Sequence, residues 1–282
     1  MSMEVRIRPA RISDRAPLMS FIKHVWGGHD YIPRVWDYWI RDAESKMFVV
    51  VADGVPVGMN RVRFMEDGSA WFEGARVHPA FRGQGLASML GENSMRLAKG
   101  RGATTFRLAS GSRNHTAHRQ IARIGFKEVA RFSVYDPPRR RRGKGSPETL
   151  RRDQSREALK LIRGSTEYRL GHGVFWHNFG AASLTPEVVG VLAREGAVKR
   201  LGRAVAVVRT GGVGPGLWEE VGFIGGPPGD AVELARAVTG RKEATERWVF
   251  LPQGSPIIGA LREAGFKRSH SNILFERMAA KG

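Results

Sequence analysis

Residues 71–88 read Trp-Phe-Glu-Gly-Ala-Arg-Val-His-Pro-Ala-Phe-Arg-Gly-Gln-Gly-Leu-Ala-Ser. The first seven are mostly apolar and β-prone, so they predict a strand, which Pro79 ends because proline has no N–H for a ladder. Beyond Gly83 and Gly85, apolar residues recur at helical spacing as far as Gly100. The stretch therefore predicts a strand, a glycine turn and a helix in succession.

Such a turn is suited to hold a diphosphate. The first turn of a helix leaves N–H groups unpaired and carries partial positive charge. Gly83 and Gly85 have no Cβ, so backbone donors can approach a phosphate closely, and Arg82 adds a cation. The glycine pattern of dinucleotide-binding folds and the Gly-Lys-Ser/Thr of nucleotide triphosphatases are both absent from this turn.

Arg82-x-x-Gly85-x-Ala87, preceded by Val77-His78-Pro79, resembles the acetyl-coenzyme A signature of the GNAT N-acetyltransferases. The resemblance implies an α/β fold with a mixed, mostly antiparallel sheet flanked by helices. It also implies acetyl-CoA as co-substrate and no metal. The residues implied to hold the diphosphate are Arg82, Gly83, Gln84, Gly85, Leu86, Ala87 and Ser88. The backbone of Ala75, Arg76 and Val77 would pair with the pantetheine arm, and Asn114, ahead of Gly125-Phe126, would contact it.

The same resemblance suggests Glu73 as the base that takes the amine proton. Strand alternation predicts that Glu73 shares a face with Ala75 and Val77. The alternative is a structural Glu73 paired with Arg61 or Arg63 on a neighbouring strand. Many relatives carry a tyrosine that protonates the leaving thiolate, but spacing from Asn114 puts Ile121 there. Tyr135 or water could serve as the acid, or the thiolate could leave unprotonated.

A helix–loop–helix near the N-terminus would form one wall of the acceptor site, with Asp30 and Tyr31 of its loop facing the substrate. Trp36 and Trp39 of its second helix belong either to this wall or to the core. The run from Gly27 to Pro33, Trp39-Ile40-Arg41-Asp42 and Glu73-Gly74-Ala75-Arg76-Val77 are similar to the histidine N-acetyltransferase-like branch of GNATs. That branch implies a free amino acid or similar small α-amine as acceptor.

Cysteine is absent from the 282 residues, which excludes disulfides, thiolate metal sites and an acyl-cysteine intermediate. Direct attack by the amine is therefore the expected route. No histidine pair has a familiar zinc spacing, so no metal site is predicted. The chain has no apolar run of membrane-spanning length and no secretory signal pattern, so we expect a cytoplasmic protein.

The net charge of +19 is concentrated in residues 137–163, where ten basic residues stand against three acidic ones. This segment begins with two prolines and an arginine run, so it predicts a basic linker between domains at 1–136 and 164–282. Contact of Arg139–Lys144 with nucleic acid is an alternative, but no aromatic residues stand among these arginines to stack on bases.

The second half repeats the first faintly. Residues 260–267 resemble residues 121–127, and the strand predicted near Trp218 resembles the one at Trp71. At the position that corresponds to the diphosphate-binding glycine turn, this half has Gly225-Gly226-Pro227-Pro228-Gly229-Asp230. The prolines remove N–H donors there, and Asp230 adds negative charge. We therefore expect a degenerate GNAT-like domain that cannot hold coenzyme A and has a structural or homodimerising role.

The sequence thus predicts an N-acetyltransferase acting on a small primary amine. Two alternatives stay open. The acceptor could be a protein or a ribosome docked by the basic linker, or the chain could be a non-catalytic regulator that binds acetyl-CoA.

Overall fold

The computed structural model describes residues 3–138, 145–213, 216–239 and 244–279, and the chain divides into two compact units. The first unit comprises Met1–Leu108, Thr116–Lys127 and Glu276–Gly282. The second comprises Ala109–His115 and Glu128–Phe275. Both units are discontinuous in sequence. Thr116–Lys127 belongs to the first unit and interrupts the second, and strand β14 (Lys267–Met278) begins in the second unit and ends in the first.

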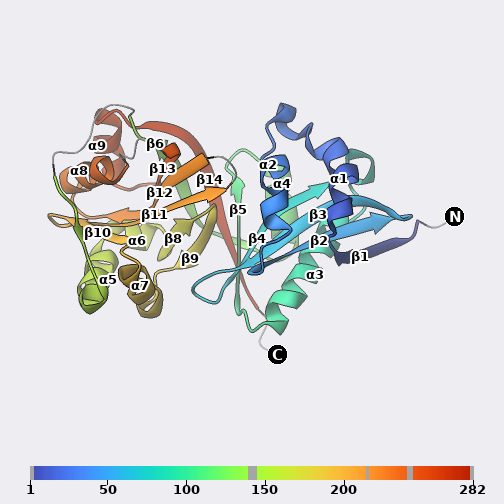
Figure 1. Cartoon of the computed structure of the whole chain (residues 1–282), viewed down its shortest axis with the longest axis horizontal. Coiled ribbons are helices and arrows are strands. Elements are labelled where there is room, and N and C mark those ends of the chain that lie inside the picture. The colour runs from blue at the N-terminus through green and yellow to red at the C-terminus, as the bar shows by residue number, and fades with distance from the viewer. Residues whose placement is uncertain (1–2, 139–144, 214–215, 240–243, 280–282) are drawn as a thin grey trace. The chain divides into compact units, whose positions relative to one another are not determined.

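The sheet of the first unit is built from consecutive strands and is mostly antiparallel (Figure 1). Strands β1 to β4 pair in antiparallel order, whereas β4 and β5 are parallel. The five strands are β1 (Val5–Pro9), β2 (Ser45–Ala52), β3 (Val55–Phe64), β4 (Ala70–Val77) and β5 (Thr105–Gly111). The strand predicted from Trp71 to Val77 is confirmed.

Helices cover both faces of this sheet. The helices are α1 (Arg15–Ile22), α2 (Ile32–Trp39), α3 (Leu86–Gly100) and α4 (His115–Arg123). Met47, Val49 and Val51 of β2 pack with α1 and α2, while Val50 and Ala52 pack with Leu86 and Leu90 of α3. The alternation of a β-strand thus sends successive apolar side chains into two cores, one for each helical layer.

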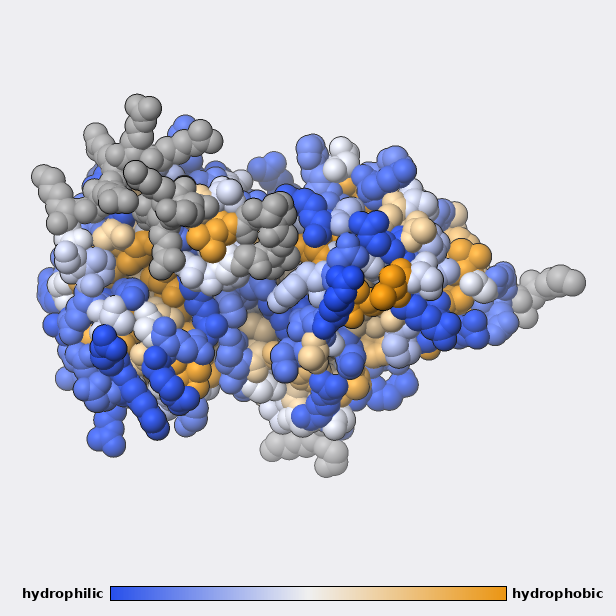
Figure 2. All heavy atoms as spheres, in the orientation of Figure 1, coloured by the Kyte–Doolittle hydropathy of each residue, from blue (hydrophilic) through white to orange (hydrophobic). Residues whose placement is uncertain are grey.

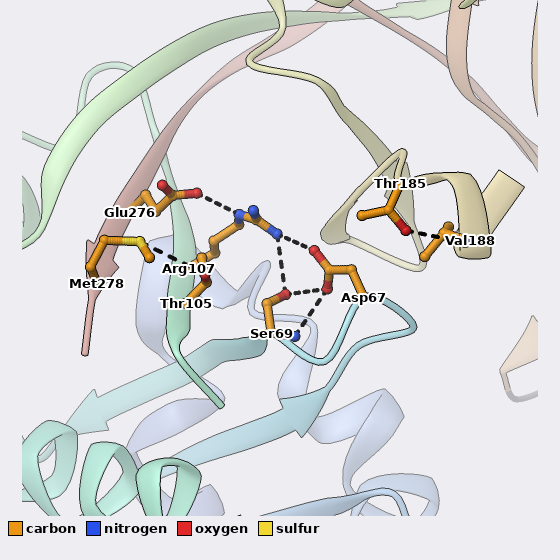
Figure 3. Close-up of polar contacts among 8 residues, drawn as sticks. All are labelled: Asp67, Ser69, Thr105, Arg107, Thr185, Val188, Glu276 and Met278. Atoms are coloured by element: carbon orange, nitrogen blue, oxygen red, sulfur yellow. Dashed lines mark hydrogen bonds and ion pairs between the residues drawn. The ribbon is translucent and has the colours of Figure 1, made fainter. Parts of the chain in front are cut away.

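A buried arginine ties the first unit's last strand to its earlier ones (Figure 3). Arg107 of β5 donates to Asp67, in the β3–β4 turn, at 2.6 Å and to Glu276 of β14 at 2.8 Å. Arg107 is only 4% exposed, so both carboxylates compensate a charge that has lost its water. Residues 276–278, at the end of β14, therefore belong to the first unit.

The sheet strands of the second unit are hydrogen-bonded in the order β6-β13-β12-β11-β10-β7. Only β12 and β13 are parallel among these neighbours. Its strands are β6 (Lys127–Asp136), β7 (Glu148–Thr149), β10 (Val198–Leu201), β11 (Ala204–Val213), β12 (Gly216–Gly225) and β13 (Ala244–Pro252), with a separate hairpin of β8 (Val174–His177) and β9 (Gly180–Ser183). Its helices are α5 (Ser155–Gly164), α6 (Thr166–Leu170), α7 (Pro186–Arg194), α8 (Pro228–Val238) and α9 (Ile257–Glu263).

Part of the predicted linker at 137–163 is ordered secondary structure. It contains β7, which pairs with β10, and most of α5, whose Ala158 and Ile162 are fully buried. Arg139–Lys144 lie outside the described residues. The division at residues 136 and 164 stays a prediction.

The two units share a strand pattern. In the first, β3 and β4 are antiparallel and β4 and β5 parallel; in the second, β11, β12 and β13 repeat these directions. A cross-strand pair of opposite charges also recurs. Arg61 of β3 stands opposite Glu73 of β4, and Arg209 of β11 stands opposite Glu220 of β12. The fold is α/β, with mixed, mostly antiparallel sheets flanked by helices and a repeated strand arrangement.

Candidate active site

Strand β4 contains a bulge at its middle. Glu73 pairs with Arg61 and Arg76 with Met59, so Gly74 and Ala75 together oppose the single residue Asn60. The extra residue reverses the alternation, which puts Glu73 on the same face as Arg76. The prediction that Glu73 shares a face with Ala75 and Val77 is therefore wrong.

Gly74 is required at this bulge for two reasons. Its φ is +69°, and a Cβ there would lie 2.8 Å from Cζ3 of Trp39. We expect Gly74→Ala to lower the free energy of unfolding by about 2–3 kcal/mol, because left-handed backbone strain adds to displacement of Trp39. Gly68→Ala is the matched control, since Gly68 has φ +74° but no atom within 4 Å of that position. If urea unfolding gives the two variants equal losses of unfolding free energy, the contact between the added Cβ and Trp39 costs nothing.

Glu73 is held by a buried arginine. Arg61, 1% exposed, donates through Nη1 to Glu73 Oε1 at 2.6 Å, through Nη2 to Asp42 and through Nε to Ser45. Its guanidinium also lies over the ring of Trp39, 4.7 Å from the centroid. Within the described part of the chain, Glu73 Oε2 has no hydrogen-bond partner. Glu73 is therefore paired with Arg61 through Oε1, and its Oε2 is left for another hydrogen-bond partner.

Arg76 joins the predicted acceptor loop to β4. Its Nε donates to Asp30 Oδ2 at 2.6 Å, and its guanidinium lies 4.4 Å from the ring centroid of Trp26 and 5.7 Å from that of Tyr31. The other oxygen of Asp30 accepts from Ile32 N at 3.0 Å. Because both oxygens are engaged and its side chain is buried, Asp30 positions Arg76 rather than facing solvent.

Tyr31 stays a neutral hydroxyl at physiological pH. Burial raises its pKa above the usual value, and the negative charge of Glu73 raises it further. Its ring meets that of Trp39 edge-on at 5.7 Å. Trp36 is fully buried in the core between α1, α2 and the sheet, so its core interpretation is confirmed, whereas Trp39 belongs to both core and site.

The predicted glycine turn is present. Gly83 and Gly85 have φ of +80° and +78°, and Gly85 is the N-cap of α3, a helix of 15 residues. A Cβ at either glycine would meet no atom within 4 Å, so the space before the helix is open. Leu86, 2% exposed, anchors the first turn in the core. This exposed N-terminus fits a diphosphate through the donors of residues 83–88.

Beyond Phe72, the edge of β4 that faces away from β3 lacks a strand partner among the described residues. Its parallel ladder with β5 joins only Ala70–Phe72 to Phe106–Leu108. Residues 73–77 continue past it, and Arg82 Nε reaches back to Val77 O at 3.4 Å. Backbone pairing of a pantetheine arm with Ala75–Val77 needs such an edge.

The structure does not support Tyr135 as the acid. Tyr135 is fully buried in the core of the second unit, together with Val249 and Leu251, and its hydroxyl has no hydrogen-bond partner among the described residues. Ile121 is buried in α4. Asn114 lies in residues 109–115, which group with the second unit, so its contact with a cofactor stays a prediction.

Sequence reasoning missed two residues of this cluster. Asp42 accepts a hydrogen bond from Arg61, which also donates to Glu73. The ring of Trp26 stacks on the guanidinium of Arg76, and the backbone of Trp26 is left-handed, with φ +52°. Gly74 inside a strand was a signal for the bulge, because glycine in a strand interior often marks one. No comparable signal pointed to Trp26, since its position depends on the loop that follows α1.

Comparisons with known proteins find similar sequences and folds. The sequence profile of the Acetyltransferase (GNAT) family matches residues 15–126. A histidine N-acetyltransferase of Xenopus tropicalis is 32% identical over 85 residues, which are 30% of this chain and 26% of that protein. One of Oreochromis niloticus is 29% identical over 85 residues, 30% of this chain and 25% of that protein. The match therefore spans about a quarter of the length of these relatives.

Solved structures match the whole fold. A GCN5-related N-acetyltransferase from Sphaerobacter thermophilus has a TM-score of 0.63 at 16% identity, covering 97% of this chain and 95% of the other. A protein of Thermoplasma acidophilum has a TM-score of 0.61 at 17% identity, covering 97% and 100%. In the ranges that the structure describes, no helix has the length and apolarity needed to cross a membrane. Residues 15–126 of this chain are thus similar in sequence to the Acetyltransferase (GNAT) family.

Proposed function

We propose that the chain is an N-acetyltransferase that moves the acetyl group of acetyl-CoA directly to a small primary amine, first of all the α-amine of a free amino acid. One observation carries the proposal: a carboxylate with one open oxygen, Glu73, precedes an unpaired strand edge and a glycine turn at a helix N-terminus. These are a base, a place for the pantetheine arm and a place for the diphosphate, in chain order.

The transfer needs few protein groups. The amine nitrogen attacks the thioester carbonyl, so that a C–N bond forms and the C–S bond breaks. Glu73 takes the amine proton through Oε2, directly or through water. The thiolate leaves and takes a proton from water, because Tyr135 is fully buried and the residue at position 121 is an isoleucine, which has no proton to give. Backbone N–H groups on the β4 edge would stabilise the developing oxyanion.

The acceptor class follows from the groups around Glu73. A free amino acid carries a carboxylate, and Arg76 offers a guanidinium whose Nη2 is buried without a hydrogen-bond partner in the described residues. Tyr31 adds a neutral hydroxyl. The curated relatives are named histidine N-acetyltransferases, so histidine is the first acceptor to test.

We expect Asp30→Asn to raise the KM for an amino-acid acceptor about tenfold while kcat changes less than about twofold, because a bond to a charged partner contributes about 1.5–3 kcal/mol. The variant loosens Arg76 without touching Glu73. Asp37→Asn is the control, since its carboxylate is exposed on α2. If kcat falls and KM stays constant, Arg76 does not bind the acceptor.

The proposal is tested by thiol release from acetyl-CoA in the presence of free amino acids, polyamines and basic peptides. Preference for one amino acid supports it. Turnover of basic peptides alone favours a macromolecular acceptor. Tight binding of acetyl-CoA without any turnover favours a regulator, and absence of binding removes the basis of the proposal.

A further inference from the structure

Helix α5 of the second unit presents a row of exposed cations. Its apolar residues Ala158 and Ile162 are fully buried, which fixes the opposite face toward solvent. Figure 2, in the orientation of Figure 1, shows a hydrophilic surface over this part of the unit. The exposed cations are Arg152, just before the helix, and Arg156, Lys160 and Arg163 within it.

The spacing of these cations is regular. Arg156, Lys160 and Arg163 are separated by four and three residues, so they fall within one narrow arc of the helix. At a rise of about 1.5 Å per residue, the row from Arg152 to Arg163 is about 16 Å long. One strand of a nucleic-acid duplex presents a phosphate about every 3.4 Å of axis, so the row can follow several successive phosphates.

Three cations of this row lack the ion pairs that other cations of the unit form. Arg209 pairs with Glu195 at 2.8 Å, and Arg236 with Glu233 at 2.9 Å. Arg152, Arg156 and Lys160 form no salt bridge with any described residue. Glu157 on the same helix is already bound by Arg200. Arg163 interacts electrostatically with the carboxylate of Glu187 at the start of α7. The charge left for a partner is therefore that of Arg152, Arg156 and Lys160.

We propose that this face of α5 docks on the phosphate backbone of a nucleic-acid duplex. Residues 152–164 contain no aromatic side chain, so base stacking of single strands has no platform there. The apolar side of α5 is buried in the unit, so the helix cannot insert it into a membrane. Regularly spaced charge without stacking or inserting residues fits sequence-independent contact with a double helix.

The probe is a labelled duplex of about 20 base pairs, as RNA and as DNA, titrated with the full chain between about 50 and 200 mM salt. Three phosphate contacts predict a slope of log K against log salt of about −2.7. The triple variant Arg156→Gln, Lys160→Gln, Arg163→Gln should bring the slope to about −1 and weaken binding at least tenfold at low salt. RNA and DNA arms show whether the duplex form matters.

The matched control removes the same charge elsewhere, through Arg6→Gln, Lys46→Gln and Lys99→Gln, which are exposed in the first unit. Its salt slope should stay near that of the parent chain. Equal weakening by both triple variants overturns the proposal, as does a preference for single strands or for anionic vesicles over the duplex. Acetyl transfer to a small amine should be unchanged in both variants, so a failure here is distinguishable from a failure of the proposed function.

Discussion

Glu73→Gln is expected to lower kcat/KM for the amine about 100- to 1,000-fold, because the amide cannot take the proton that the attacking nitrogen must lose. Binding of coenzyme A should be unchanged, since the substitution keeps the shape of β4 and leaves the glycine turn untouched. Steady-state thiol release gives the first quantity and calorimetric titration the second.

The control for Glu73→Gln must separate catalysis from folding. Arg61 loses a charged partner but keeps Asp42 and Ser45, so the variant should lose about 1–3 kcal/mol of unfolding free energy and remain folded. Glu44→Gln removes an exposed carboxylate from the same unit and should alter neither rate nor stability. Retained turnover in a folded Glu73→Gln protein would reduce Glu73 to a structural partner of Arg61.

The strand, glycine turn and helix of residues 71–100 could be predicted from sequence because every signal in them is local. Pro79 ends the strand, Gly83 and Gly85 adopt positive φ, and apolar spacing carries α3 to Gly100, as the structure confirms. Such features depend on the backbone preferences of neighbouring residues. They need no knowledge of what the chain packs against.

The pairing of Glu73 could not be decided in the same way. Arg61 and Arg63 both lie on β3, and only the register puts Arg61 opposite Glu73, with Arg63 Nε at 3.9 Å from the same oxygen. Register depends on the turn around Asp67 and on the bulge at Gly74, and one extra residue moves every later side chain to the other face. Local pattern therefore fixed the strand but not its faces.

The second unit shows a similar limit. The high charge of residues 137–163 led to the prediction of a linker, and helix α5 was missed. Ala158 and Ile162 nevertheless have the spacing of one buried helical face. Tyr135 was expected at the end of the last strand of the first domain. Instead, β6 pairs with β13, and the ring of Tyr135 lies in the core of the second unit. Both depend on contacts with residues distant in sequence.

A comparison of helix α8 in the second unit with helix α3 in the first suggests the sharpest test of the predicted diphosphate site. Helix α8 begins at Pro228, so its third residue is Asp230, and Asp230 accepts from Arg203 N at 2.8 Å. Helix α3 begins at Leu86, so its third residue is Ser88. Ser88→Asp therefore gives the predicted diphosphate site of the first unit the charge that α8 carries at the same position.

We expect Ser88→Asp to weaken coenzyme A binding about tenfold to 100-fold, because the added carboxylate repels the diphosphate. The same charge stabilises a helix N-terminus by about 0.3–1 kcal/mol, so the thermal unfolding temperature of the free protein should rise or stay constant. Ser88→Asn is the neutral control of the same size. Calorimetry should give one coenzyme A per chain for the parent and for Ser88→Asn. Because Ser88→Asp should lose affinity without losing stability, unfolding cannot explain the result; equal affinity of the two variants would mean that the diphosphate binds elsewhere.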